Sequence, residues 1–313
     1  MSKVYNMGPS PHIRTSETVD KVMLDVIIAL VPALLMAVYV FKTRALIVTA
    51  VSVIFCMLTE MVFNKIRKVE CTLHDGSAVV TGILFAFVIP VGMGLQYVAI
   101  GAVVSIALGK MLFGGLGQNV FNPALVGRAF VQASWPVAIT SFTLDGMAGA
   151  TMLDAMKRGI PEILIGEGNP YVQALIGKMG GCLGETSALA LLIGGAYLIY
   201  KKQIDWKMPV IIIATVAVLT GIAGRDPLMH VLSGGLMLGA FFMATDMVTS
   251  PVTPKGKLIY AFGIGALIAL IRMKGGYPEG TAFSILIMNG VTPLINRYTM
   301  PKKFGEVKAD GKK

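Results

Sequence analysis

The sequence has few of the residues that soluble proteins and metalloproteins depend on. Charged residues make up only 14% of the 313 positions, and there are 3 cysteines and 3 histidines. An average soluble domain carries about 25% charged residues, so this composition excludes that class. Cys56, Cys71 and Cys182 lack CxxC spacing and are too few for a four-cysteine iron–sulfur or zinc site within the chain. They are interpreted as small apolar packing residues, with a ligand shared with another subunit as the alternative.

Histidine is equally scarce. His12, His74 and His230 lie far apart in the sequence, and no haem or metal motif joins them. We therefore predict no metal site and no catalytic residue in this chain. Any redox cofactor that it carries is expected to be organic.

Long apolar runs are abundant instead. Hydrophobic residues make up 55% of the chain, the mean hydropathy is +0.74, and about 17–25 apolar residues can cross a bilayer core. The first run follows a mostly polar segment, so no cleavable signal peptide is expected. We predict an all-α integral membrane protein of about ten spans, several of them short or interrupted by Gly or Pro: 22–41, 45–64, 77–92, 95–113, 121–135, 184–200, 207–223, 228–246, 257–273 and 279–295.

Lysine and arginine are distributed unevenly around these spans. With the N-terminus inside the cell, most of the 27 basic residues fall on the cytoplasmic side, as the positive-inside rule requires. Both termini are then cytoplasmic, and the long segment 136–183 faces outward. The net charge of +10 follows from this bias and from attraction to anionic lipid, so the expected partner is a bilayer and not a nucleic acid.

Two pairs of segments resemble each other at nearly the same offset. Residues 81–86 resemble 238–243, and residues 121–125 resemble 288–294. An odd number of spans per half turns the second half over in the membrane, and inverted repeats often bind ligands on broken helices at the midplane. The predicted divisions are a cytoplasmic segment 1–21, a first five-helix repeat 22–135, an external region 136–183, a second five-helix repeat 184–296 and a basic cytoplasmic tail 297–313.

Residues 114–123 interrupt the apolar pattern with glycines and polar amides. Non-helical backbone at membrane depth is tolerated only inside protein or along a cavity. Pro123 suits the first turn of the next helix and Asn122 suits its cap. Arg128 follows inside an apolar helix, where it needs a partner or a path to water. Either this segment only breaks and packs helices, or Asn119, Asn122 and Arg128 line a flavin or ion site.

Acidic residues in the apolar parts of the chain have a functional and a structural interpretation. Glu185 stands beside two hydroxyl residues at the start of the sixth span, where it either stabilises a helix N-terminus or binds a cation or cofactor. Asp25, Glu60 and Asp246 lie in apolar surroundings, where charge is costly and marks functional sites. We take Asp25 and Asp246 as ion-pathway candidates; local pairing with basic residues or an interfacial position is the alternative.

The long polar segment contains a turn of small residues at 145–151, Asp-Gly-Met-Ala-Gly-Ala-Thr. Small side chains let a bulky group approach the backbone, Gly149 permits a positive φ, and Thr151 offers a hydroxyl for a covalent group. The segment resembles the flavinylation motif Asp-x-x-Ser/Thr-Gly-Ala-Ser/Thr, whose last hydroxyl takes FMN through a phosphoester. Asp145, Gly149, Ala150 and Thr151 match, whereas Ala148 replaces the usual hydroxyl residue. The alternative is a plain outer loop with Asp-Gly as its turn.

Further motifs, in order along nearly the whole chain, carry a wider resemblance. They lie at 75–77, 81–84, 113–119, 121–124, 127–130, 184–187 and 244–246. Together they resemble the family that contains the D subunit of the Rnf complex and the B subunit of the sodium-pumping NADH:quinone reductase. The short N-terminal segment is more similar to the Rnf protein. The resemblance implies covalent FMN on Thr151, attached by a flavin transferase, and a second, noncovalent flavin (riboflavin) within the bundle, near 121–130.

The same resemblance implies an electron carrier in the cytoplasmic (inner) membrane of a bacterium or archaeon. Rnf complexes couple electron transfer between reduced ferredoxin and NAD⁺ to Na⁺ or H⁺ movement. The expected partners are subunits A, B, C, E and G, above all the flavoprotein G subunit and the NAD-reducing C subunit. The alternatives are the quinone reductase protein and a flavin-free small-solute transporter or channel, a class that leaves residues 145–151 without a role.

Overall fold

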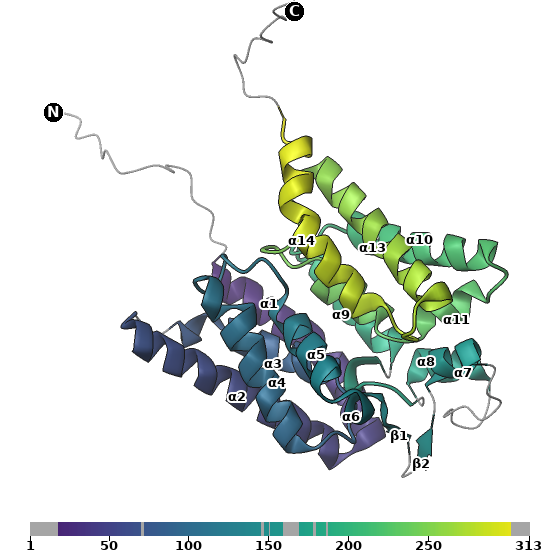
Figure 1. Ribbon diagram of the computed structural model, residues 1–313, viewed down its shortest axis with the longest axis horizontal. Coiled ribbons are helices and arrows are strands. Elements are labelled where there is room, and N and C mark those ends of the chain that lie inside the picture. Colours follow the sequence, from purple (N-terminus) through teal and green to yellow (C-terminus); the bar gives the residue numbers. More distant parts are fainter. Residues whose placement is uncertain are drawn as a thin grey trace, which may run out of the picture.

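The computed structural model describes residues 18–69, 72–144, 147–149, 151–158, 169–177, 180–185 and 187–301. These parts fold into two groups of helices, one drawn in purple to teal and one in green to yellow in Figure 1. The first residues of α1 and the last residues of α14 lie toward the same end of the molecule, and the segment that links the two groups lies toward the other end. The predicted all-helical class is confirmed, except for one two-stranded hairpin in the linking segment.

The first group is built around two long apolar helices and a short buried one. The Thr18 hydroxyl caps the first helix by accepting the Lys21 N–H at 3.4 Å. The second helix packs against the third and fourth, and the fourth packs against the fifth. The members are α1 (Val19–Phe41), α2 (Thr43–Arg67), η1 (Leu73–Asp75), α3 (Ser77–Phe87), α4 (Leu95–Gly109), η2 (Met111–Phe113) and α5 (Pro123–Ser134).

The second group contains three long helices and one broken segment. Its members are α9 (Ala188–Tyr200), α10 (Lys207–Ile222), α11 (Pro227–Leu232), α12 (Leu236–Leu238), the π-helical η4 (Gly239–Met243), α13 (Pro254–Lys274) and α14 (Thr281–Thr299). Here α10 packs against α13, and α13 packs against α14. The main contacts between the two groups are those of α1 with α9 and of α5 with α14.

The linking segment consists of short elements. Strands β1 and β2 pair antiparallel, with Leu144 opposite Met147. The elements are α6 (Pro136–Thr140), β1 (Phe142–Leu144), β2 (Met147–Gly149), α7 (Met152–Arg158), α8 (Pro170–Ile176) and η3 (Leu183–Glu185). An isolated bridge from Pro90 to Cys182 ties the end of this segment to the first group.

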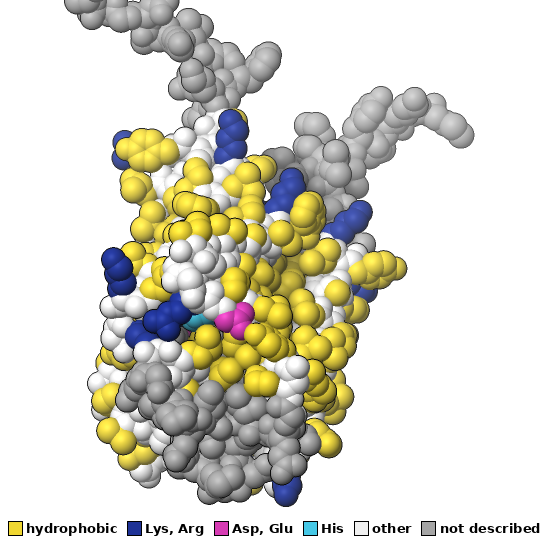
Figure 2. Space-filling view, turned by 90° about the vertical axis from the view of Figure 1, so that its right-hand side faces the viewer, with side chains coloured by type: hydrophobic (Ala, Val, Ile, Leu, Met, Phe, Trp, Pro, Cys, Tyr) yellow, Lys and Arg dark blue, Asp and Glu magenta, His cyan; other side chains and the backbone are white. Residues whose placement is uncertain are grey.

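Four helical stretches are long and apolar enough to cross a membrane: Val19–Phe41, Thr43–Arg67, Leu95–Phe113 and Pro254–Lys274. Their outer surfaces carry exposed apolar side chains such as Leu35, Tyr39 and Ile54. Figure 2 shows hydrophobic side chains over much of the described surface on one face. Exposed apolar surface of this extent requires an apolar surrounding, so the chain is a membrane protein.

Two predicted spans are helical over only part of their length. The span at 77–92 leaves the α-helix after Phe87, shortly before Pro90, which has no N–H for a helical hydrogen bond. The span at 228–246 is divided into α11, α12 and η4. Gly234 has a φ of +71°, a conformation that glycine adopts without strain and that ends a helix.

Candidate functional site

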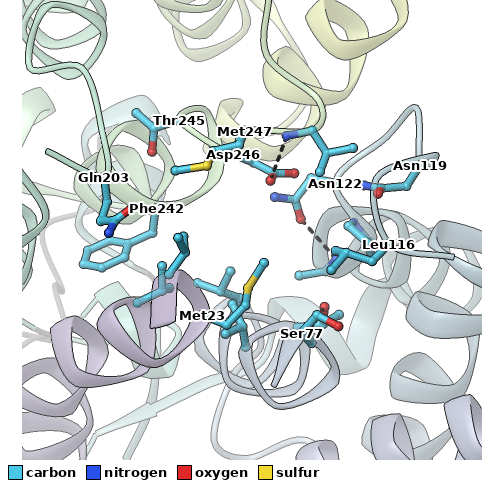
Figure 3. Close-up of a pocket in the computed structure, with 18 of the residues that line it drawn as sticks. Met23, Ser77, Leu116, Asn119, Asn122, Gln203, Phe242, Thr245, Asp246 and Met247 are labelled. Carbon is cyan, nitrogen blue, oxygen red and sulfur yellow. Dashed lines mark hydrogen bonds between the residues drawn. The ribbon is translucent and has the colours of Figure 1, made fainter. Parts of the chain in front are cut away.

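Two cavities contain the polar residues that the sequence singles out. The larger, cavity A, has a volume of about 120 Å³. It lies beside the first residues of α1, α3 and α5 and the segment 241–248, toward the end of the molecule where α1 begins and α14 ends. Its wall is mostly apolar, and Figure 3 shows that Asn119, Asn122, Gln203 and Asp246 surround it together with Phe242.

The amides of cavity A belong to the segment that enters α5. Asn122 caps α5, as predicted: its Oδ1 accepts the N–H groups of Ala124 at 3.1 Å and Leu125 at 3.4 Å. Its Nδ2 donates to the Met243 carbonyl at 3.4 Å and so joins the two helical groups. Asn119 is buried, and its Oδ1 has no hydrogen-bond partner. A buried acceptor without a donor is costly and fits a ligand that supplies an N–H or O–H.

The two aspartates differ in their surroundings. Asp246 lines cavity A and accepts hydrogen bonds from Thr249 Oγ1 at 3.1 Å and the Val248 N–H at 3.3 Å. Asp25 lies outside the wall of cavity A and accepts from the Tyr197 hydroxyl at 2.8 Å. Its other oxygen accepts from Gln203, which does line the cavity, at 3.3 Å. Asp25 is also 3.8 Å from Lys201, the local pairing named above as its alternative.

Lys110 is a cavity residue that sequence reasoning missed. Its Nζ lies 2.8 Å from both carboxylate oxygens of Glu60 and 2.6 Å from Ser77 Oγ. The side chains of Lys110 and Glu60 are 2% and 0% exposed. Thr72 donates to the same carboxylate at 2.6 Å. The sequence did contain a signal, because a lysine and a glutamate that lie in apolar stretches each need a partner. It could not show that these two residues, 50 positions apart, pair with each other.

The smaller cavity, cavity B, has a volume of about 50 Å³ and lies beside the linking segment. Thr151 lines it with Met152 and Leu153, together with residues of both helical groups. Thr151 is partly buried, and its Oγ1 accepts the Asp154 N–H at 3.3 Å, at the start of α7. Gly149 ends β2, whereas Asp145 and Ala150 lie outside the described residues.

Arg128 crosses from the first helical group to the second in the wall of cavity B. Its Nη1 donates to the Val88 carbonyl at 2.5 Å, and its Nη2 pairs with Glu279 Oε2 at 2.5 Å. A second carboxylate, Glu185 Oε1, lies 3.8 Å from Nη1. The predicted need of Arg128 for a partner is met by a carboxylate 151 residues later in the sequence.

Glu279 is the second residue that sequence reasoning missed. It lies between α13 and α14, next to Pro278, and its Oε1 accepts the Gly235 N–H at 2.8 Å. The signal available in the sequence was an acidic residue at the first position of a predicted span.

The cap of α9 is Ser187, whose hydroxyl accepts the Ala190 N–H at 3.2 Å. Glu185 therefore faces Arg128 and does not cap that helix.

The predicted residues thus fall into two separate sites. Asn119, Asn122 and Asp246 line cavity A, whereas Thr151, Arg128 and Glu185 line cavity B. Within the described parts of the chain, no three His, Cys, Asp or Glu side chains are grouped to hold a metal ion. Cys56 and Cys182 are both buried free thiols.

Comparison with known proteins identifies the family. Residues 6–305 match the NQR2, RnfD, RnfE family. The chain is 46% identical to the D subunit of the proton-translocating ferredoxin:NAD(+) oxidoreductase complex of Clostridium ljungdahlii, with 96% of each chain covered. It is 48% identical to the D subunit of the Na(+)-translocating ferredoxin:NAD(+) oxidoreductase complex of Acetobacterium woodii, again over 96% of each chain. The D subunit of the ion-translocating oxidoreductase complex of Stutzerimonas stutzeri is 35% identical, with 94% of this chain and 93% of that protein covered. With its predicted motifs and nearly full-length matches, the chain belongs to the NQR2, RnfD, RnfE family.

Proposed function

We propose that this chain is the D subunit of an ion-translocating ferredoxin:NAD⁺ oxidoreductase complex. The relatives in Clostridium ljungdahlii and Acetobacterium woodii carry that name and match over nearly their whole length. The observation that supports a redox role most directly is Thr151, whose hydroxyl lies at cavity B within the segment that resembles a flavinylation motif. Neither a quinone reductase protein nor a flavin-free transporter is favoured by any contact within the described chain.

Thr151 is the residue to which FMN would be attached. Its hydroxyl is not committed to a strong hydrogen bond, and small residues precede it. Cavity B is far smaller than the roughly 300–1,000 Å³ of typical ligand pockets, so it could receive the phosphoryl end while the ring system lies outside it. A flavin transferase would form the phosphoester. The residues present therefore fit attachment of FMN through its phosphoryl group. The flavin ring would lie on a surface shared with a partner subunit.

Cavity A is the place where a second, noncovalent flavin would bind. The unpartnered Asn119 Oδ1 could accept a ring N–H, and Phe242 offers an aromatic face. The cavity of about 120 Å³ would have to widen to hold a flavin ring. The neighbouring segment contains Gly114, Gly115 and Gly117, all at positive φ. Flavins exchange single electrons, and the protein supplies position and electrostatic tuning.

We further propose ten membrane crossings arranged as two inverted five-helix repeats. The packing of α2 with α4 and of α4 with α5 has counterparts in α10 with α13 and α13 with α14. Elements at equivalent positions meet across the interface: α1 with α9, and α5 with α14. Asn122 and Asn289, which the internal resemblance aligns, are also neighbours, with the Asn122 nitrogen 3.1 Å from the Asn289 side-chain amide. Both termini would be cytoplasmic, in the inner membrane.

The two cavities would then lie toward opposite membrane faces. Cavity B, near the outer face, would receive electrons from the flavoprotein G subunit, and cavity A, near the cytoplasmic face, would pass them toward the NAD-reducing C subunit. Subunits A, B and E complete the proposed set of partners. Asp246, in the wall of cavity A, and Asp25, linked to it through Gln203, are the proposed ion-pathway groups. Unchanged ion pumping per electron after substitution of both aspartates would remove them from the pathway.

Deletion and complementation test the proposed function. Inverted membrane vesicles from a strain without this chain should lose ferredoxin-dependent NAD⁺ reduction and the ion movement linked to it. The wild-type chain should restore both, whereas Thr151→Ala should restore assembly of the complex but not electron transfer. Vesicles that keep ferredoxin-dependent NAD⁺ reduction without the chain would contradict the proposal.

A further inference from the structure

Two carboxyl groups are buried beside one guanidinium in cavity B, and they are not equally satisfied. Glu279 has both oxygens occupied, one by Arg128 and one by the Gly235 N–H. Among the residues that the structure describes, Glu185 Oε2 accepts the Cys182 N–H at 3.3 Å, and its Oε1 has no hydrogen-bond partner. The side chains of Glu185 and Glu279 are 7% and 16% exposed. An ionised Glu185 would therefore be a buried charge with poor compensation.

The two carboxyl groups also approach each other. Gly235 has no side chain, and a Cβ atom placed on it would lie 2.5 Å from Glu279 Oε1 and 3.4 Å from Glu185 Oε1. Both carboxylate oxygens therefore lie close to Gly235. Two carboxylates that share a buried site repel strongly, and one of them retains a proton to a higher pH.

The other charged and titratable groups around the pair do not remove the repulsion between the two carboxylates. Arg128, on α5, serves both carboxyls but contacts Glu279 closely and Glu185 only at 3.8 Å. Arg272, on α13, donates to the carbonyls of His230 on α11 and Ser233. The Cys182 thiol, which borders Glu185, is neutral because burial raises its pKa.

The titration of the two carboxyl groups is displaced in opposite directions. Both precede the helices that follow them: Glu185 lies in η3 before α9, and Glu279 lies between α13 and α14. Burial, followed by the charge of Glu279, raises the pKa of Glu185 to about 8. Burial also acts to raise the pKa of Glu279, but Arg128 and the Gly235 N–H outweigh it and lower that pKa.

We propose that Glu185 and Glu279 form a proton-binding site that holds one shared proton at neutral pH next to Thr151. The site exists in the chain whether or not a flavin is attached. A second step rests on the proposed function: an electron added to FMN on Thr151 places negative charge near the pair, which then binds its proton more tightly. The electron comes from the reduced donor of the complex. Where the pair has lost its proton before the electron arrives, it takes one up from water, and this uptake partly balances the added charge.

The first experiment uses the flavin-free variant Thr151→Val, reconstituted in lipid. Infrared difference spectra between about pH 5 and pH 10 should contain a protonated-carboxyl band that disappears as the pH rises through about 8. Glu185→Gln should remove this band, and glutamine copies the shape of the neutral acid, so the fold should persist. Glu279→Gln should also remove it at neutral pH, because Glu185 can then ionise against Arg128.

The outcomes are distinct. Asp20→Asn is the control, because Asp20 is an exposed carboxyl in the first turn of α1, and it should leave the band unchanged. No titrating carboxyl band in the flavin-free chain, or a band unaffected by Glu185→Gln, would overturn the proposal. A band that survives Glu279→Gln would overturn the sharing of the proton. A band suppressed by Na⁺ at constant pH and ionic strength would show a cation site in place of a proton site.

The second experiment uses the flavin-loaded complex and measures the pH dependence of the Thr151 flavin potential. The proposal predicts a change of slope near the pH at which the pair ionises, and loss of that change in Glu185→Gln. An identical pH profile in wild type and variant would overturn the redox link. Absence of a flavin on Thr151 would overturn the proposed function and leave the infrared result standing.

Discussion

Single buried charges in this chain depend on named partners. Lys110 is the sharpest case, because its ammonium is enclosed by the Glu60 carboxylate and the Ser77 hydroxyl, all within 2.8 Å. Burying an ion is tolerated when a partner and further hydrogen bonds compensate it, and removing one partner leaves an uncompensated charge. The pair therefore holds α2, α3 and α4 together only while both members are present.

Lys110→Met should destabilise the chain strongly. The substitution leaves Glu60 buried without its cation, and breaking a buried pair in this way costs about 3–5 kcal/mol of unfolding free energy. The measurement is thermal or denaturant unfolding of the purified chain in detergent micelles. Lys255→Met is the matched control: Lys255 is exposed at the first turn of α13, and its loss should change stability by no more than about 0.5 kcal/mol.

The double variant Lys110→Met/Glu60→Leu tests whether the unpaired Glu60 charge causes the loss of stability. It should be more stable than Lys110→Met alone, because an apolar replacement of both members removes the unpaired charge. A single variant as stable as the wild type would show that the Glu60 carboxylate is not held by Lys110.

Individual residues also show where sequence reasoning reaches its limit. The role of Asn122 as a cap was predictable, because capping depends on its immediate neighbours and on Pro123. The need of Arg128 for a partner was predictable from its apolar helix, but the identity of that partner was not. Glu279 reaches it only through the packing of α5 against α14, which no local pattern encodes.

Among the helices, close approach of α4 and α5 depends on glycines at their contact, and Gly109 is the one that meets the first residue of α5. A Cβ atom at Gly109 would lie 2.7 Å from the Pro123 Cα and 3.0 Å from its Cβ. Backbone atoms cannot move aside as a flexible side chain can. Gly109 therefore fixes the position of the first turn of α5, and with it the Asn122 side chain at cavity A.

Gly109→Ala should push these helices apart. Overpacking of this kind costs about 1–3 kcal/mol of stability, to be measured by unfolding in micelles. Gly276→Ala is the matched control, because a Cβ there meets no atom within 4 Å and its φ is not positive. Equal stability of the two variants would contradict the close contact.

Helix positions were largely predictable, and helix breaks only partly. Apolar runs indicated the places of α1, α2, α4 and α13, because a long apolar stretch has few alternatives to a buried helix. The sequence indicated that several spans are short or interrupted by Gly or Pro, but it did not predict the π-helical part of the span 228–246. That part depends on how η4 packs against α10 and α14.

For the chain as a whole, the proposed orientation places the two ends of α10 on opposite sides of the membrane. Lys207 begins α10 and Ala223 follows its last residue, and both are exposed. Cys56 and Cys182 are buried, so a Cys71→Ser background supplies a low reference for labelling. In intact cells, a membrane-impermeant maleimide should label Ala223→Cys, and it should label Lys207→Cys only after the membrane is opened. The reverse pattern would contradict the orientation.

The assembly of the two helical groups could not be predicted in detail from the sequence. The internal resemblance between residues 121–125 and 288–294 predicted a relation between the groups, yet it did not predict that Asn122 and Asn289 would be neighbours. The resemblance to the Rnf family predicted the activity, and the match over residues 6–305 bears out the family. Covalent FMN on Thr151 stays a prediction.

In-gel fluorescence tests this central claim most directly. Wild type, Thr151→Ser and Thr151→Ala should be expressed with the flavin transferase and run on a denaturing gel under ultraviolet light. The account predicts a fluorescent band for the wild type, a band for Thr151→Ser because a hydroxyl remains, and none for Thr151→Ala. A dark wild-type band, with the transferase active on another substrate, or a fluorescent Thr151→Ala band, would contradict flavin attachment at Thr151.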